Sequence, residues 1–582
     1  MNRIRKSIIL TIAAALWLAS CKNDKYLDIT PDGRVSLNDV FTDAQNTESY
    51  LNTVYNYLPF GGIYYHYYEF LAAFTDDAQS SDAPTQAGFA ATEWYSGSLT
   101  PSKNPLYTGN YPTNNGNRYE RNWEGIRKVN TFLANIDKAA VKNESNRASM
   151  KAEARVLRAF FYSRLIRKYG GMPIIKEPLS PEYDFSTLKR NTFQECVDFI
   201  VEDCNAALAE ANFTWRRVST ADAGRMTKAV AEALKTQVTL YAASPLWNKT
   251  NDAALWQKAA VTAKTALEDL LANGYQLYNN YGEFFENSPD DGANPKDKET
   301  ILVSRAFGAQ YPLNMLVLRM ASVLNADKAG SCPTQELVDT YDMDNGEMAI
   351  TGYSDADHMH PIINPASGYD DANPYVHRDP RFYATVWYNN AYYGKVNGAD
   401  YYIGAYKGGN VGISNTRQRT HTGYYLRKYK APEDQSNNSG NESFRFIRLA
   451  EVYLSYAEAE NEAVGPDQNV YSAINAIRRR VGMPDLPAGL SKDDMRERIR
   501  RERRVEMPYE EIRFYDERRW KILDKSEKVT TGMSWTKNAD GTFSNERIVV
   551  DRRKTWEDKY LILPIPLDEI NKMPSFEQNP GW

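Results

Sequence analysis

The side chains that could do chemistry in this chain are few and scattered. Its 582 residues include five histidines and four cysteines, and we find no Gly-x-Ser-x-Gly, His-Glu-x-x-His, P-loop or Gly-x-Gly-x-x-Gly motif. In the stretch SDADHMHP, a strand would turn His358 and His360 to one face as metal ligands. That spacing matches no known metal site, and loop histidines beside aspartates are usually solvated. We therefore expect no metal and no cofactor.

The neighbouring carboxylates Asp76 and Asp77 are the remaining candidates for catalysis. A glycoside hydrolase needs two carboxyl groups that face each other across the sugar, about 5–9.5 Å apart. The side chains of adjacent residues diverge, and the sequence identifies no second partner for either one. A hydrolase is therefore the weaker interpretation, and we expect a protein that is not an enzyme.

The charge balance argues against a nucleic-acid partner. The formal net charge is −5 at pH 7, whereas nucleic-acid phosphates require a basic surface. The segment that looks most basic, residues 492–525, carries twelve Lys or Arg against ten Asp or Glu, interleaved at helical spacings. We interpret it as a network of ion pairs within and between helices.

The first residues have the pattern of an export signal. A positive start with Arg3, Arg5 and Lys6 precedes an apolar run too short to span a bilayer, which needs about 20 residues. The run ends in Leu-Ala-Ser-Cys, which resembles a bacterial lipobox, where the cysteine is acylated and becomes the first residue of the mature protein. We predict a signal peptide over 1–20, lipidation of Cys21 and a tether over 21–35. The alternative is an ordinary secretory signal with an incidental cysteine.

Beyond the tether, apolar residues repeat at helical spacing in several segments. In residues 150–169 they recur at intervals of three and four and stop at Gly170-Gly171, which predicts an amphipathic helix. The segments 227–244 and 447–464 show the same pattern, with clear stops. Their many alanines would let stacked helix pairs approach closely. We predict a mainly α, tetratricopeptide-like scaffold, although no clean 34-residue repeat is present; the alternative is an unspecialised helical bundle.

Two long stretches, about 60–118 and 273–443, break this pattern. They are rich in Gly, Pro, Asn and aromatic residues, and irregular segments of this length are usually functional. Residues 381–429 alone hold ten of the 40 tyrosines. Alternation around Val386 also permits one or two short strands. We expect these stretches to form an irregular, loop-rich region for a ligand or a partner.

The order and spacing of many short segments resemble one family, the SusD/RagB nutrient-binding lipoproteins of Bacteroidota. The resemblance covers nearly the whole chain and includes these segments: YLDITPDG, WEGIRKVNTFLANID, KAEARVLRAFFYSRLIRKYGGMPII, GRMTKAVAEALKTQVTLYAASP, TQELVDTYDMDNGE, RDPRFYATV, IRLAEVYLSYAEAENEA, AINAIRRRVGMP, IRRERRVEMPYEEIRFYDERRW and YLILPIPLDEINKMPSFEQNPGW. It departs locally at Glu510-Glu511-Ile512, where the family usually reads Glu-Gly-His. The resemblance implies a non-catalytic lipoprotein that caps a SusC-like TonB-dependent outer-membrane transporter and helps deliver oligosaccharides or other nutrients. The segment CKND, after the predicted cleavage, is similar to the family's signal for exposure on the cell exterior.

Sugars present flat C–H faces and many hydroxyls, so a sugar site needs rigid aromatic platforms with polar neighbours. The stretch that precedes WEGI has this composition, with Trp94, Tyr95, Tyr107 and Tyr111 among several asparagines. We expect Trp94 to be the main platform; the alternative is that such aromatics only pack loops on the scaffold. The stretches that supply the family's ligand platform further nominate Asp76, Tyr311, Asn314 and Trp387. The tyrosines of 381–429 could instead face the transporter.

The ligand itself stays open at this stage. We expect a glycan, with a peptide or another nutrient as the alternative. The predicted organisation is a single domain over 36–582, with helical pairs at about 119–272 and 444–525 and the loop-rich region at about 60–118 and 273–443.

Overall fold

The computed structural model of the chain describes residues 37–59, 69–82, 90–104, 106, 119–217, 222–286, 297–304, 329–396, 398–429 and 444–582. The predicted signal peptide, Cys21 and tether lie outside these ranges. Within the described ranges, no helix is long and apolar enough to cross a membrane.

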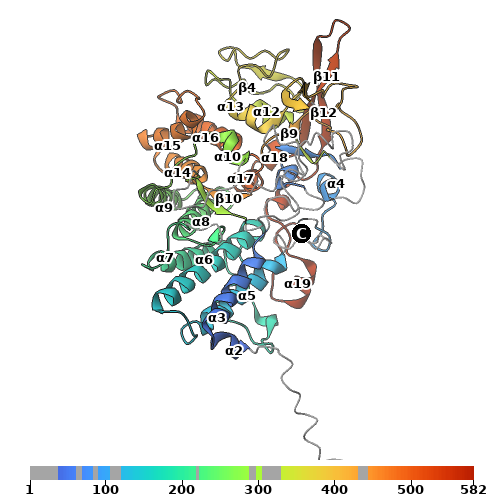
Figure 1. The fold of residues 1–582 in the computed structure, drawn as a ribbon. Coiled ribbons are helices and arrows are strands. Elements are labelled where there is room, and N and C mark those ends of the chain that lie inside the picture. Colours follow the sequence, from blue (N-terminus) through green and yellow to red (C-terminus); the bar gives the residue numbers. More distant parts are fainter. Residues whose placement is uncertain are drawn as a thin grey trace, which may run out of the picture.

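Antiparallel helices stacked side by side form the scaffold (Figure 1). Each helix packs on the next: α5 on α6, α6 on α7, α7 on α8, α8 on α9, and α9 on α14, which also contacts α15 and α16. The helices are α2 (Leu37–Phe41), α3 (Ala44–Val54), α5 (Tyr119–Asn135), α6 (Glu144–Tyr169), α7 (Phe193–Leu208), α8 (Lys228–Ala243), α9 (Ala253–Ala272), α14 (Leu449–Val464), α15 (Gln468–Arg480) and α16 (Lys492–Glu506). The chain therefore has the helical-pair scaffold that its periodicity predicts.

The ends of these helices follow their local sequence. Asn143 caps α6 by accepting a hydrogen bond from the backbone N–H of Asn146, and Gly170, at φ +76°, ends the helix where the glycine pair predicts. Thr192 and Glu195 form a capping box at the start of α7. The caps fix where each helix begins and ends, and so fix the short turns between antiparallel neighbours.

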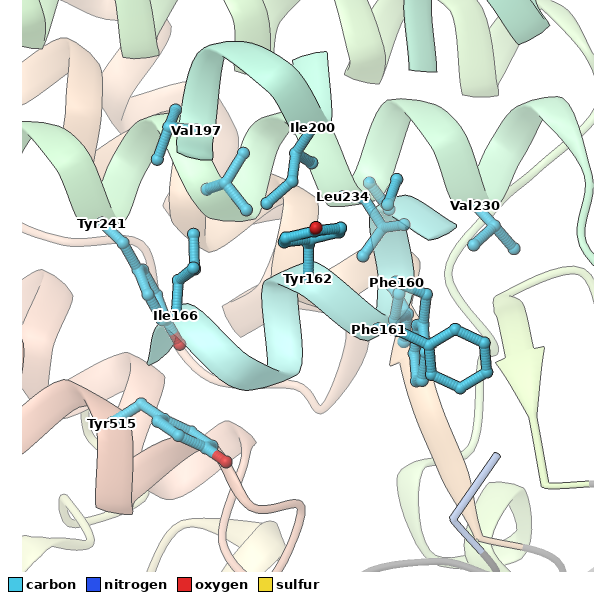
Figure 2. Packing of buried hydrophobic residues seen from close by; sticks show 14 of the residues in the cluster. Phe160, Phe161, Tyr162, Ile166, Val197, Ile200, Val230, Leu234, Tyr241 and Tyr515 are labelled. Carbon is cyan, nitrogen blue, oxygen red and sulfur yellow. The ribbon is translucent and has the colours of Figure 1, made fainter. Parts of the chain in front are cut away.

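The core lies where α6, α7 and α8 meet (Figure 2). Phe161, Tyr162 and Ile166 of α6 are fully buried against side chains of α7 and α8 such as Ile200 and Leu234. The apolar positions that recur along α6 in the sequence thus face the core, as predicted. Helix α5 approaches α6 at Gly125, where a Cβ atom would lie 2.6 Å from the ring of Phe161. Only glycine permits this close approach.

The region that breaks the helical pattern is built on two-stranded antiparallel pairs (Figure 1). The pairs are β1 (Ala78–Ser80) with β3 (Ser331–Pro333), β2 (Thr300–Val303) with β10 (Arg445–Arg448), β4 (Ile350–Tyr353) with β5 (Pro361–Ile363), β6 (Val386–Trp387) with β9 (Tyr425–Leu426), β7 (Tyr392–Val396) with β8 (Ala399–Tyr402), and β11 (Val529–Lys537) with β12 (Phe543–Arg552). The short strand at Val386 confirms the expected alternation. The longest pair, β11–β12, was not anticipated.

Short helices complete the fold. They are α4 (Ala90–Tyr95), α10 (Tyr281–Glu286), α12 (Gln335–Thr340), α13 (Pro380–Thr385), α17 (Ile512–Arg519), α18 (Leu523–Ser526) and α19 (Leu567–Lys572), with 3₁₀ turns at Tyr55–Tyr57, Leu71–Phe74, Phe185–Thr187 and Asp558–Leu561. Helices α12, α13 and α10 join the irregular region to α16 through a second apolar cluster.

Buried ion pairs connect the irregular region to the scaffold through α16. The carboxylate of Glu506 contacts Arg381 of α13 (3.1 Å), Arg448 of β10 (2.6 Å) and Arg480 of α15. Burial opposes ionisation of Glu506, but these three guanidinium groups outweigh it and hold the pKa of the carboxyl well below its usual range. Glu502 likewise bridges Arg381 and Arg478. Residues 492–525 thus take part in a network of buried ion pairs, as their nearly equal numbers of basic and acidic residues predict.

Candidate functional site

The structure buries the aromatic residue that the sequence favoured as a ligand platform. Trp94, at the end of α4, is 0% exposed, and its indole packs against Phe74 (5.5 Å between ring centroids), Phe514 (5.8 Å) and Tyr560 (6.1 Å). The expectation that Trp94 is an exposed platform is therefore wrong. The alternation of aromatic and polar residues in this stretch reflects packing of α4 on the scaffold.

Tyr95 is also part of the interior. Its hydroxyl donates to the carbonyl of Ala73 (2.5 Å) and accepts from the N–H of Ser80 (3.0 Å), and the guanidinium of Arg553 lies over its ring. Burial raises the pKa of Tyr95, so the phenol stays neutral and keeps donating this bond. Tyr95 thus fixes β1 to the end of α4, and the expectation that it contacts ligand is wrong.

Asp76 is buried and paired with two arginines. Its carboxylate accepts two hydrogen bonds from Arg513 (both 2.8 Å) and lies 3.2 Å from Arg504. Burial opposes its ionisation, but these two guanidinium groups dominate and hold the pKa of Asp76 well below its usual range. The neighbouring Asp77 pairs with Arg504 (2.7 Å). Asp76 is therefore part of a buried ion-pair network, and its nomination as a ligand residue is wrong.

Trp387 is buried as well. Its ring packs on Tyr393 (5.2 Å) under the guanidinium of Arg427 (4.5 Å). It belongs to a small apolar cluster that also contains Val411 and Tyr425. Its nomination as a ligand residue is wrong, because the short β6–β9 pair turns it inward.

The other nominated residues, Tyr107, Tyr111, Tyr311 and Asn314, lie outside the described residues.

Residues that flank the ranges 60–68, 83–89 and 305–328 lie close together around the β1–β3 pair. Ser81, just before residues 83–89, donates its N–H to the carbonyl of Gly330 (2.9 Å), just after residues 305–328. Next to them, Asp82 forms an ion pair with Arg417 (3.0 Å). Glu69, which follows residues 60–68, accepts hydrogen bonds from Ser80 (2.6 Å) and from Ser331. The structure thus brings distant parts of the sequence to one buried, hydrogen-bonded platform.

A polar hollow of about 450 Å³ lies in the loop over residues 408–419, and Arg417 of this loop pairs with Asp82 beside the platform. It is lined by Gly408, Gly409, Gly412, Ile413, Ser414, Thr416, Gln418 and Arg419. The same loop contains Arg417, whose carbonyl accepts a hydrogen bond from the N–H of Ala329 (2.7 Å). Hydroxyl, amide and guanidinium groups at the surface of one hollow can bind a ligand with many hydroxyls.

The glycines give the hollow its shape. A Cβ atom at Gly409 would lie 2.2 Å from the carbonyl oxygen of Gly404, and one at Gly412 would lie 2.2 Å from that of Tyr406. Only glycine allows the loop to fold back this tightly. The buried Tyr425 supports it from below by donating to the carbonyl of Val411 (2.9 Å).

Exposed tyrosines lie on the hairpin that leads into this loop. Tyr392 of β7 and Tyr402 of β8 are each 50% exposed, with ring centroids 5.4 Å apart. The hydroxyl of Tyr401 accepts a hydrogen bond from the side-chain amide of Asn410 in the glycine-rich loop. By contrast, Tyr393, Tyr424, Tyr425 and Tyr429 are buried. Sequence reasoning found the tyrosine-rich segment, but it did not separate these two exposed rings from the packed ones.

His358 and His360 each pair with a carboxylate. His358 pairs with Glu336 (3.1 Å) and stacks on Tyr353, whereas His360 pairs with Asp355 (3.0 Å). Across the described residues, no group of three or more histidine, cysteine or acidic side chains could hold a metal ion.

Known proteins similar to this chain share its fold over nearly its whole length. A SusD-like protein of Bacteroides ovatus is 24% identical over 537 residues, covering 89% of this chain and 83% of the relative. The crystal structure of a SusD-like protein from Bacteroides fragilis aligns with a TM-score of 0.74 and 25% identity, covering 94% of this chain and 98% of that one. A second structure from the same organism, named a SusD-like carbohydrate-binding protein, aligns with a TM-score of 0.70 and 23% identity, covering 92% and 100%.

The comparison with protein families agrees with these likenesses. Residues 25–240 match a family described as "Starch-binding associating with outer membrane". Residues 271–582, more than half of the chain, match the family described as the SusD family. The helical-pair scaffold and the irregular region built on it are the fold that these relatives share. The chain belongs to the SusD family.

Proposed function

We propose that this protein binds a glycan at the cell surface and passes it to a SusC-like TonB-dependent transporter for uptake. Membership of the SusD family supports this most strongly, because a matching family is described as starch-binding and a solved relative is named as carbohydrate-binding. The protein would act as a binding module and leave the ligand chemically unchanged.

The polar hollow supports a glycan as the ligand. Ser414, Thr416, Gln418 and Arg419 offer both donors and acceptors, which sugar hydroxyls need. The exposed rings of Tyr392 and Tyr402 offer flat faces for sugar C–H groups on the adjoining hairpin. We further propose that Tyr107, Tyr111, Tyr311 and Asn314 contact the same ligand.

Location and anchoring complete the proposal. The family description places such proteins at the outer membrane, and Cys21 would carry the lipid that holds the chain there, facing the cell exterior. Two acyl chains anchor a protein stably where one is marginal.

A binding assay against separate panels of oligosaccharides and peptides tests this proposal. The protein used lacks its signal peptide and carries Cys21→Ser for solubility. We expect an oligosaccharide to bind and to remain intact, and Tyr402→Ala to weaken its affinity by about five- to 150-fold, the scale of a truncated aromatic anchor. Trp556→Ala, which also removes an exposed aromatic ring, is the matched control and should leave affinity unchanged. Binding of peptides alone would favour the alternative nutrient, and cleavage of the oligosaccharide would show an enzyme.

A further inference from the structure

A second hollow, at the start of α5, differs in character from the polar one. It is a groove of about 520 Å³ between the first half of α5, the connector over residues 173–188, and α19 with the residues that follow it. Most of its wall is apolar, including Trp123, Ile175, Leu188, Met573 and Phe576. Both its volume and its largely apolar lining are typical of a ligand-binding cleft.

The wall of this groove is held in place by the core. The ring of Trp123 packs edge-on against Tyr119 (6.2 Å) and Tyr162 (5.9 Å). The hydroxyl of Tyr162 donates to the carbonyl of Pro173 (3.0 Å) and accepts from the N–H of Ile175 (2.8 Å). One buried tyrosine thus fixes both the aromatic wall and the connector, so the groove is preformed.

Apolar side chains are left exposed at this groove. Phe185, on the short 3₁₀ turn, is 41% exposed, and Trp123, Leu179 and Leu188 are only partly buried. Exposed apolar groups that line one concave surface mark a site of interaction more often than isolated ones do. Their burial against a partner would be favourable at about 25 cal/mol per Å².

The rim of the groove is acidic. Its lining includes the carboxylates of Glu120, Glu124, Glu177 and Glu569 against two cations, Arg127 and Lys572. Lys572 is already paired with Glu569 (2.7 Å). Glu120 and Glu177 are both exposed, and Glu120 lies within electrostatic range of Lys572. An occupant with positive charge next to an apolar group would complement this rim.

The connector cannot recruit an occupant as an added strand. The carbonyls of Ile175 and Lys176 accept from Asn130 (2.8 Å) and Arg158 (3.2 Å), and the N–H of Ile174 donates to Asn191 (3.0 Å). Since the backbone groups of residues 174–176 are already bonded inside the protein, this part of the connector recognises an occupant through side chains.

We propose that the groove binds a segment of a partner protein in which an apolar side chain lies next to lysine or arginine. The apolar wall takes the apolar side chain, and the acidic rim pairs with the neighbouring cation. A glycan fits this wall less well, because it would leave many hydroxyls facing carbon atoms without hydrogen-bond partners. This site is separate from the polar hollow and does not depend on glycan binding.

Photocrosslinking in intact cells tests the proposal with the full-length chain. Phe185 is replaced by p-benzoylphenylalanine, and Val261, an exposed residue of α9, carries the same replacement as the matched control. We expect the probe at Phe185 to give a crosslink that mass spectrometry places in another protein, at an apolar residue beside lysine or arginine. The probe at Val261 should give no crosslink at that segment.

Charge reversal then tests the rim. Glu120→Lys combined with Glu177→Lys should lower the yield of this crosslink by about three- to tenfold, because rim charges set encounter rates. Glu268→Lys, an exposed acidic residue on α9, should leave the yield unchanged.

Four results would overturn the proposal: no crosslink at Phe185, a crosslink only to residues 21–36 of the same chain, a crosslink only to a second copy, or a yield that charge reversal does not alter. Glycan binding is measured separately, so failure of the proposed function would not be mistaken for failure of the groove.

Discussion

Substitution of Trp94 by alanine separates a packing role from a ligand-binding role. The indole is fully buried between Phe74, Phe514 and Tyr560, and the guanidinium of Arg518 lies over its face (5.4 Å). Truncation would leave a cavity among rigid rings that cannot collapse into it. We expect the free energy of unfolding to fall by about 3–5 kcal/mol, the range for buried Phe or Trp replaced by Ala.

The loss in melting temperature follows from the size of the chain. Unfolding entropies near 60 °C are about 2.1 cal/mol/K per residue, which gives about 1.2 kcal/mol/K for a cooperative unit of this length. A loss of 3–5 kcal/mol therefore lowers the melting temperature by about 3–4 °C. Trp94→Phe should cost less, because it keeps most of the ring contacts and removes an indole N–H that has no hydrogen-bond partner among the described residues.

Calorimetry and oligosaccharide titration of the same protein samples provide the test. Trp556→Ala, at an exposed tryptophan, is the control for removing an indole, and should change the melting temperature by less than about 1 °C. Trp94→Ala should keep the affinity of the wild-type protein below its lowered melting temperature. Loss of affinity with an unchanged melting temperature would refute the packing role and return Trp94 to the binding site.

Four further predictions concern other parts of the molecule. Cys21→Ser should release the protein from the membrane fraction in cells without the transporter; continued association there would contradict lipidation. Gly412→Ala should weaken oligosaccharide binding by about tenfold or more by displacing the loop at Tyr406, and unchanged affinity would exclude the polar hollow. Arg381→Met should cost about 3–5 kcal/mol of stability in denaturant titrations, since it removes the arginine partner of buried Asp379 and one of the guanidinium partners of Glu502 and Glu506; a loss below 1 kcal/mol would contradict this. Glu458 is buried, which opposes ionisation, but Arg519 and Trp520 bring its pKa to about 2, below its unfolded value of about 4.3. Its contribution to stability is therefore full above about pH 4.3 and lost as the pH falls toward 2, so the stability difference between wild type and Glu458→Gln should shrink over that range.

Much of the fold could be predicted because the scaffold obeys local rules. The end of α6 at Gly170 and the buried face that includes Phe161 follow from helical period and a glycine stop. That α16 forms ion pairs could be predicted, because residues 492–525 hold nearly equal numbers of basic and acidic side chains. The particular partners could not, because Arg381 and Glu506 are separated by more than 120 residues.

The site was less predictable because burial of an aromatic residue depends on tertiary contacts. Trp94 and Tyr392 look alike in the sequence, each beside another aromatic residue. Their exposure differs because Trp94 packs on Phe514 and other rings, whereas Tyr392 lies beside the equally exposed Tyr402 on the β7–β8 hairpin. The sequence nevertheless contained a signal for the polar hollow in the glycines that precede Ser414, because the tight fold of this loop requires them. The apolar groove could not be predicted, because its walls come from residues near 123, 188 and 573.

The bridging position of Glu506 constrains how this part of the protein can evolve. Three arginines from three separate elements meet at its one buried carboxylate. Replacing Glu506 alone would leave three buried cations short of a partner, and replacing one arginine alone would leave the carboxylate with fewer counter-charges than its burial requires. The effects of such changes are therefore strongly non-additive. Within a lineage these residues should change together or not at all, whereas exposed residues of the glycine-rich loop, such as Thr416 and Gln418, can vary one at a time.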